Sequence, residues 1–355
     1  MSQLITLSKS SPEFESYLLG TFSQDKRALP VQTLNVNSAS ETVTFRIVPI
    51  TSLQRPEFFT VFLQTFKVKS FLLILVPLFL VLTINLADSA PLDPQTTVLA
   101  TIGVLLAFVS VNLRNDYMDH MKGVDRVLEK SGSRAIQNGW VTAAQVKFYS
   151  SVLLALAILC AIPIIIALPD VIWVLGASVA VGLWAQFKKQ NSFKYRIGGE
   201  LALFLMFGPF LTVGYQQAMG ILWDAESVAL GCLWGWLVLF VVHLKNFANI
   251  LPSAQAGFTN TINWLGFDKA RRLLAFWWVI FVLFNLVYHG AYAGKYWGFY
   301  ASVVLIFLSF SFIARLKNIS SPAGSELQGV YRSGFKLFLT TIGLWVFECL
   351  WYLLQ

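Results

Sequence analysis

Long apolar runs recur along this chain from Phe71 to its end. Each run is close to the ~20 residues that an α-helix needs to cross a bilayer. The pattern predicts nine membrane-spanning helices, at residues 71–87, 97–115, 148–168, 170–187, 199–220, 227–249, 272–290, 296–314 and 335–354. Only the Leu168-Pro169-Asp170 break separates the third run from the fourth, and it predicts a tight hairpin because proline cannot continue a helix. The predicted fold class is all-α, a polytopic membrane bundle of nine helices.

The first 60 or so residues follow a different pattern, with polar and apolar positions mixed. One stretch, from Glu41 to Pro49, alternates as a β-strand does. The opening residues have neither a long apolar run nor a cleavage pattern, so no signal peptide is expected. We therefore predict a small N-terminal cytoplasmic extension over residues 1–64 and an intramembrane domain over residues 65–355.

Lysine and arginine gather in alternate loops of this predicted bundle. They are concentrated before the first helix and in the second-to-third, fourth-to-fifth, sixth-to-seventh and eighth-to-ninth loops, whereas the charged residues of loops 88–96 and 221–226 are all acids. Cytoplasmic loops carry the excess of Lys and Arg in membrane proteins. The predicted topology therefore has a cytoplasmic N-terminus and an external C-terminus, most simply in a bacterial cytoplasmic membrane, with a plastid membrane left open.

Composition narrows the class of protein. Hydrophobic residues make up 56% of the chain and charged residues 12%, with a mean hydropathy of +0.65, whereas soluble domains carry about 25% charged residues. A disordered chain, a disulfide-framed secreted domain and an ordinary soluble enzyme are excluded. The loop charges account for the net charge of +8 without nucleic acid as a partner.

The densest group of polar residues lies at the end of the second predicted helix. If that helix continues, Asn112, Asp116 and Asp119 follow spacings of four and three and share one face, with Asn115 beside them. Carboxylate and amide oxygens suit Mg²⁺, which also bridges to phosphate oxygens. The pattern favours a magnesium site built from Asn112, Asp116 and Asp119. The alternative is a solvated helix end whose acids balance Lys122 and its neighbours.

A basic cluster stands between the fourth and fifth predicted helices. Its members Lys194, Tyr195 and Arg196 could hold a polyanion or a substrate carboxylate. The alternative is ordinary positive-inside charge, which is the interpretation we prefer for Lys188 and Lys189.

The block from Asn112 to Asp125 resembles the first aspartate-rich motif of the UbiA superfamily of intramembrane prenyltransferases. It is most similar to the 1,4-dihydroxy-2-naphthoate prenyltransferase (MenA) branch, where the motif runs N-x-x-N-D-Y-x-D-x-x-x-G-x-D. Three further segments match that branch in the same order: Arg134…Gln137-x-Gly139, Tyr195-Arg196…Gly199-Glu200…Phe207-Gly208-Pro209, and Gly257…Leu265-Gly266 with Ala270-Arg271. The resemblance covers about residues 65–355, and the family's nine-helix bundle agrees with the predicted count.

This resemblance implies prenyl transfer within the membrane, in quinone biosynthesis. Mg²⁺ helps a polyprenyl diphosphate ionise to an allylic cation, which an electron-rich aromatic carbon attacks. In the MenA branch the acceptor also loses its carboxylate. The implied partners are a polyprenyl diphosphate, an aromatic acceptor and membrane lipid. The implied residues for diphosphate or acceptor are Asn112, Asn115, Lys122, Arg134, Gln137, Lys194, Tyr195 and Arg196.

The second aspartate-rich motif of the family is degenerate in this chain. When the flanking glycines are aligned, its two aspartates fall on Asn249 and Ser253, and Pro252 is expected to interrupt the turn between them. Lys245, one turn before Asn249, adds a positive charge. Relative to a motif that keeps both aspartates, the local charge is more positive by about three units. Each unit changes the interaction energy with another unit charge by ~3 kcal/mol, at ~6 Å in an effective dielectric of ~20. A second Mg²⁺ is therefore expected to bind poorly.

Two hypotheses follow. In the first, the enzyme is active with one Mg²⁺: Asp116, Asp119, Lys245 and Asn249 are the catalytic candidates, and Lys245, helped by His243 or Lys194, neutralises the diphosphate. In the second, a non-catalytic paralogue keeps the fold and binds isoprenoid lipid or quinone. A transporter is a weaker third hypothesis, because no inverted repeat is visible.

Three other polar residues stand apart from these motifs. His120 is expected to lie at the surface and His289 at a membrane interface. Glu348 lies within the ninth predicted helix, where a carboxylate needs a partner, and the sequence names none.

Overall fold

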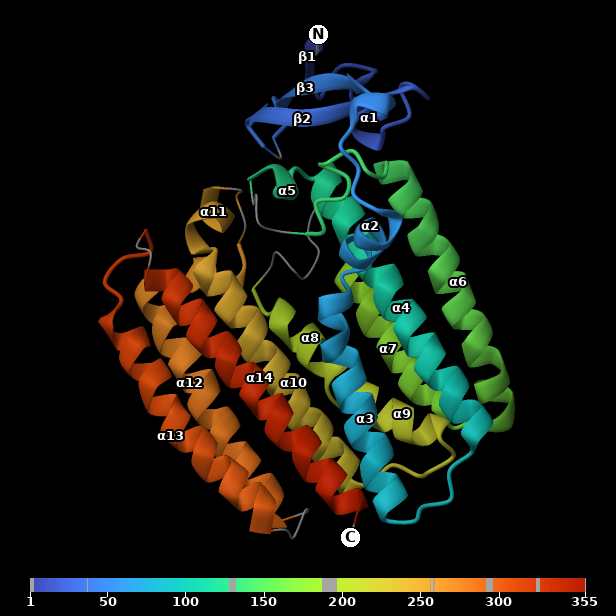
Figure 1. The fold of residues 1–355 in the computed structure, drawn as a ribbon, viewed down its shortest axis with the longest axis vertical. Helices are drawn as coiled ribbons and strands as arrows, with labels where there is room; N and C mark the ends of the chain where they lie inside the picture. Colours follow the sequence, from blue (N-terminus) through green and yellow to red (C-terminus); the bar gives the residue numbers. More distant parts are fainter. Residues whose placement is uncertain are drawn as a thin grey trace. The chain divides into compact units, whose positions relative to one another are not determined.

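The computed structural model describes residues 3–36, 38–127, 132–186, 197–255, 257, 259–291, 296–323 and 326–354 (Figure 1). The chain divides into two compact units. The first holds residues 1–71, 102–160 and 255–257, and the second holds residues 72–101, 161–254 and 258–355. Each unit is described by itself. The predicted boundary between residues 64 and 65 stays a prediction.

The first unit begins with a small antiparallel sheet. Its strands are β1 (Gln3–Ser8), β2 (Lys26–Leu34) and β3 (Thr42–Pro49), in the order β1-β3-β2, and helix α1 (Phe14–Leu19) lies between β1 and β2 in the chain. The β-like stretch at 41–49 is thus confirmed as the central strand. Alternate side chains of β3 point to one face, where Val43 and Phe45 pack with Phe14 in a buried core.

Helical segments complete the first unit. They are α2 (Phe58–Thr65), the 3₁₀ turns η1 (Ile50–Ser52) and η2 (Val68–Phe71), α5 (Val124–Val127), and most of α4 (Pro94–Met121) and α6 (Ala143–Ala167). Helix α6 begins with a capping box, in which Thr142 and Gln145 each bond to the other's main-chain N–H. Ser110 and Ser150 join α4 to α6, because each hydroxyl donates to the other residue's carbonyl, at 2.7 and 3.0 Å.

The second unit is a bundle of helices. Its members are α3 (Leu72–Ala87), α7 (Val171–Gln186), α8 (Gly199–Phe207), α9 (Pro209–Ala218), α10 (Ala225–Ala248), α11 (Ile250–Gln255), α12 (Thr261–Ala291), α13 (Tyr296–Asn318) and α14 (Glu326–Leu353). Helix α10 is the buried centre and packs on α8, α9, α12 and α14. Small residues let the backbones approach closely: a Cβ built on Gly231 of α10 would lie 2.7 Å from the Cα of Pro209.

Eight helices in the described part of the chain are long and apolar enough to cross a membrane. The remaining expected span, 170–187, corresponds to α7, whose apolar part Val171–Gly182 is shorter. The count of nine therefore stays a prediction. One expected helix, 199–220, is interrupted at Gly208, because Pro209 disfavours helical geometry in the residue before it.

Candidate active site

Helix α4 continues through the acidic block as far as Met121. This continuation sets Asn112, Asp116 and Asp119 along one helical face, as the spacing predicted. Asp116 is 3% exposed and Asp119 is 2% exposed. The alternative of a solvated helix end is therefore wrong: these carboxylates are buried.

The segment before α3 supplies partners for this face. The Nζ of Lys67 lies 2.5 Å from Oδ1 of Asp116, and the Ser133 main-chain N–H donates to Oδ2 at 3.3 Å. One turn earlier on α4, the amide of Asn112 donates to the Ser70 hydroxyl at 3.4 Å. Lys67 thus offsets the charge of the buried acid. The sequence suggested only a loop charge for it, because the pairing depends on a left-handed turn at Lys67 (φ 52°).

Asp125, the last acid of the motif, is held by the loop that follows α5. Gln137 donates to its Oδ2 at 2.9 Å, and the Arg134 guanidinium donates to its main-chain carbonyl. The Gln137 amide also contacts Nδ1 of His120 at 3.3 Å, while Nε2 of that ring lies 2.9 Å from the Leu18 carbonyl. Since a carbonyl can only accept, these contacts fix the Nε2–H tautomer of the imidazole. The expected surface position of His120 is wrong, because α1 covers it.

A second link joins the sheet to the same loop. The Arg126 guanidinium pairs with the Glu41 carboxylate at the start of β3, and it donates to the His120 carbonyl at 3.1 Å. Lys9 adds an outer contact to Glu41 at 3.3 Å. Burial lowers the pKa of Arg126, and the Glu41 carboxylate opposes that shift. The acidic motif and the N-terminal sheet therefore share one network of polar contacts.

Gly132 leaves a hollow between two acids. A Cβ built on it would lie 3.1 Å from Oδ1 of Asp125 and 3.3 Å from Oδ1 of Asp116. Within the described ranges, no three His, Cys, Asp or Glu side chains come close enough to enclose a metal by themselves. Mg²⁺, however, is usually held by one or two carboxylates together with waters and substrate phosphates. This pair of buried oxygens fits that mode of binding.

The other residues predicted for the first motif lie nearby in the chain. Asn115, on α4, and Lys122, just after that helix, are half-buried. Lys194, Tyr195 and Arg196 lie outside the described residues.

The degenerate second motif closes the end of α10. Asn249 follows the last residue of that helix, and its amide donates to the Lys245 carbonyl at 2.9 Å. Lys245 is exposed and Ser253 is buried. The expected interruption at Pro252 is wrong: the break falls at Asn249, and Pro252 lies inside α11, in a first turn where its missing N–H has no helical acceptor to lose.

Glu200 connects three helices beside this motif. Thr261 at the start of α12 donates to its Oε2 at 2.7 Å, and Nδ1 of His243 on α10 lies 3.9 Å from its Oε1. Sequence reasoning picked out Glu200 and His243 separately but not their proximity, because they lie on different helices.

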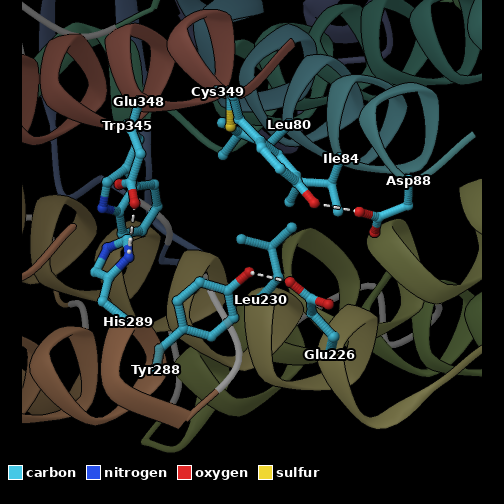
Figure 2. Close-up of a pocket in the computed structure, with 11 residues that line it drawn as sticks. Leu80, Ile84, Asp88, Glu226, Leu230, Tyr288, His289, Trp345, Glu348 and Cys349 are labelled. Carbon is cyan, nitrogen blue, oxygen red and sulfur yellow. Dashed lines mark hydrogen bonds and ion pairs between the residues drawn. The ribbon is translucent and has the colours of Figure 1, made fainter. Parts of the chain in front are cut away.

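A separate cavity of about 200 Å³ lies within the second unit (Figure 2). Nδ1 of His289 contacts Oε1 of Glu348 at 3.1 Å, which supplies the partner that this carboxylate needs. His289 is buried, and its expected position at a membrane interface stays a prediction. The Tyr288 hydroxyl donates to Glu226 at 3.5 Å, and Tyr352 donates to Asp88. These lining carboxylates thus have partners of their own.

Comparison with known proteins agrees with this architecture. The profile described as "UbiA prenyltransferase family" matches residues 74–342. Two curated proteins named 1,4-dihydroxy-2-naphthoate octaprenyltransferase, from Mycobacterium tuberculosis and Mycobacterium leprae, are 32% and 31% identical to the chain over 187 and 185 residues. Each match covers 49% of this chain, and the chain spans only 60% and 59% of the length of those relatives.

Solved structures share the fold. A digeranylgeranylglyceryl phosphate synthase aligns with a TM-score of 0.58 and 16% identity, covering 83% of this chain and 99% of that one. A UbiA homologue from Archaeoglobus fulgidus, bound to GPP and Mg²⁺, aligns with a TM-score of 0.54 and 14% identity, covering 80% and 99%.

Proposed function

Because this chain belongs to the UbiA prenyltransferase family, we propose that it transfers a polyprenyl group from its diphosphate to an aromatic acceptor of the 1,4-dihydroxy-2-naphthoate type, in quinone biosynthesis. The burial of the first motif carries this proposal. Asp116, Asp119 and Asp125 are all nearly inaccessible, and buried carboxylates are costly unless they have partners. A chain without a charged ligand to bind would gain nothing from retaining three of them. The names of the mycobacterial relatives support the naphthoate acceptor.

The first motif is the proposed site of the donor's diphosphate. Asn112, Asp116 and Asp119 are the proposed Mg²⁺ ligands, and Asp125 joins them through the hollow at Gly132. When bound, Mg²⁺ supplies positive charge that favours departure of the diphosphate. The archaeal homologue bound to GPP and Mg²⁺ supports this requirement.

Several other side chains around the motif have proposed supporting roles. Lys67 orients the Asp116 carboxylate through its ion pair. Arg134 and Gln137 hold Asp125 in place, and they are proposed to contact the diphosphate or the acceptor, as are Asn115 and Lys122. Lys194, Tyr195 and Arg196 are proposed for the same purpose on the basis of sequence alone.

The second motif is proposed to act without a metal. Lys245, on the last turn of α10, supplies one positive charge to the leaving diphosphate. Asn249 caps the same helix at the Lys245 carbonyl, so a hydrogen bond from Asn249 to substrate has to replace that contact. This arrangement predicts a one-metal enzyme.

The apolar helices support an integral membrane protein. We place its N-terminus in the cytoplasm and its C-terminus outside, in a bacterial cytoplasmic membrane, with residues 65–355 as the catalytic domain. Cysteine labelling from each side of the membrane tests this topology.

Turnover of the purified full-length protein tests the proposed activity. Protein in lipid nanodiscs is mixed with Mg²⁺, labelled polyprenyl diphosphate and 1,4-dihydroxy-2-naphthoate, and prenylated product is measured. Asp116→Asn is expected to abolish product. Asp268→Asn is the matched control, because this aspartate on α12 has a side chain that is 72% exposed, and it should retain full activity. Lys245→Ala should lower turnover without a comparable loss of thermal stability.

A non-catalytic paralogue is the second candidate, favoured by the loss of both second-motif acids. Under that hypothesis, wild type and Asp116→Asn give no product with any donor or acceptor while both still bind prenyl lipid. The non-catalytic hypothesis is rejected if the wild type forms product and Asp116→Asn does not.

A further inference from the structure

A polar cavity of about 330 Å³ lies within the first unit, between the N-terminal sheet and the loop that follows the acidic motif. The sheet contributes β2, and the loop contributes residues of α5 and of the segment after Gly132. The polar residues that line it are Gln32, Thr33, Asp125, Arg126, Arg134 and Gln137. Two of these, Arg134 and Gln137, also hold the last acid of the motif.

The geometry of β2 explains why it can form a wall. β2 is an edge strand, and its pairing with β3 skips Val31 between Pro30 and Gln32. This is a β-bulge, which locally re-aims the side chains of a strand and is common at sheet edges and next to sites. As a result, four consecutive residues, 30–33, all line the cavity, whereas a regular strand would turn every second side chain away.

Among the potential donors of this lining, two buried atoms have no hydrogen-bond partner within the described residues, namely Nε of Arg126 and Oγ1 of Thr33. The Arg126 side chain is only 3% exposed, so water does not reach its Nε from the surface. A buried polar group without a partner costs about 1–3 kcal/mol. Such groups call for an explanation, and a bound ligand is one.

The unpartnered atoms are both able to donate. The lining also holds two guanidinium groups against one carboxylate, that of Asp125. Glu41, which pairs with Arg126, is not part of this lining, so the charged side chains of the lining are Arg126, Arg134 and Asp125. A group rich in hydrogen-bond acceptors and negatively charged is the complement of this lining.

We propose that this cavity binds an oxyanion of a substrate, a carboxylate or a phosphate, and that Thr33 and Arg126 are its binding residues. The N-terminal sheet is then one wall of the substrate site. This proposal rests on the proposed prenyl transfer, which supplies two sources of oxyanion: the acceptor's carboxylate and the donor's diphosphate.

Metal-free binding measurements test this directly. Full-length protein in nanodiscs, with EDTA present to suppress the Mg²⁺ site, is titrated separately with inorganic pyrophosphate and with 1-hydroxy-2-naphthoate, an aromatic carboxylate that lacks one acceptor hydroxyl. At least one probe should bind. Thr33→Val removes the hydroxyl at nearly constant volume and should weaken binding about tenfold. Thr33→Ser keeps the hydroxyl and should bind as the wild type does.

A matched threonine provides the control for folding. Thr6, on the opposite edge strand β1, pairs with Thr44 and does not line the cavity. Thr6→Val should leave both binding and thermal stability unchanged. If Thr33→Val and Thr6→Val have the same melting temperature, the loss of affinity in Thr33→Val results from the missing hydroxyl in the cavity and not from unfolding.

Each outcome separates this proposal from the proposed function. Binding of pyrophosphate identifies a diphosphate pocket, and binding of the naphthoate identifies an acceptor pocket. If either probe binds in a Thr33-dependent way but no product forms, the cavity is supported and the transferase activity is rejected. If neither probe binds, or Thr33→Val binds as tightly as the wild type while Asp116→Asn abolishes turnover, the cavity proposal is overturned and the transferase stands.

Discussion

The pair formed by Glu41 and Arg126 is predicted to hold the N-terminal sheet on the acidic-motif loop. Both side chains are buried, with 2% and 3% of their surface exposed. Glu41→Ala leaves the guanidinium in that environment without its carboxylate. Removing one partner of a buried ion pair costs about 3–5 kcal/mol. Lys9, which also contacts Glu41, has a side chain that is 44% exposed, so Lys9→Met should cost at most about 1 kcal/mol.

Amide hydrogen exchange measures the loss of stability in the N-terminal sheet itself. Opening of the sheet exposes the main-chain N–H groups of β3, so exchange in a peptide covering residues 42–49 reports the free energy of that opening. Glu41→Ala should speed this exchange by about a hundredfold to several thousandfold. Lys9→Met should change it less than about fivefold, and exchange in α12, which belongs to the second unit, should not change.

The double variant Glu41→Leu/Arg126→Met separates charge from packing. Replacing both partners by apolar residues is often neutral or stabilising, so most of the protection lost in Glu41→Ala should return. The reasoning fails if Glu41→Ala exchanges within tenfold of the wild type. It also fails if the double variant is less protected than Glu41→Ala, because packing and not the unpaired charge would then be decisive.

Three further predictions concern the hollow at Gly132, the packing of α10 on α9, and the cavity of the second unit. Gly132→Ala places a Cβ beside two carboxylate oxygens at a positive φ and should raise the Mg²⁺ concentration needed for half-maximal turnover; Gly198→Ala, which has a positive φ but open space around it, should not. Gly231→Ala forces α10 away from α9 and should cost about 1–3 kcal/mol in thermal denaturation, whereas Gly343→Ala meets no atom within 4 Å and should be neutral. His289→Phe removes the contact partner of the buried carboxylate shown in Figure 2 and should lower stability by about 1–3 kcal/mol; an unchanged melting temperature would contradict this.

The features that the sequence predicted well are local ones. The length of an apolar run is enough to predict a membrane helix, and spacings of three and four are enough to align Asp116 with Asp119 on α4. The β-like alternation at 41–49 is equally local, and it forms β3. Even the break at Gly208 has a local cause in Pro209, but the apolar run around it is long enough for a hydropathy pattern to pass over it.

The features that the sequence missed depend on distant partners. His120 was expected at the surface because it falls on a different helix face from Asp119, yet its ring reaches the Leu18 carbonyl, 102 residues away. Lys67 resembles an ordinary loop charge until its turn brings it to Asp116. The spacing of polar and apolar residues along the chain does not predict such contacts, because each contact depends on how one segment packs on another.

The N-terminal extension shows why this limit matters for function. Its residues are mostly polar, so hydropathy treats it as solvated and separate, and resemblance to the family begins only after it. In the structure Thr33 of its β2 strand lines the cavity beside Asp125, and the Leu18 carbonyl of its α1 helix contacts His120. Glu41, just before β3, pairs with Arg126. A cover that excludes water must itself bond to the polar groups it buries, so it has to be polar on its inner face. The composition that made the extension look solvated and separate is therefore the composition that a cover over buried polar groups requires.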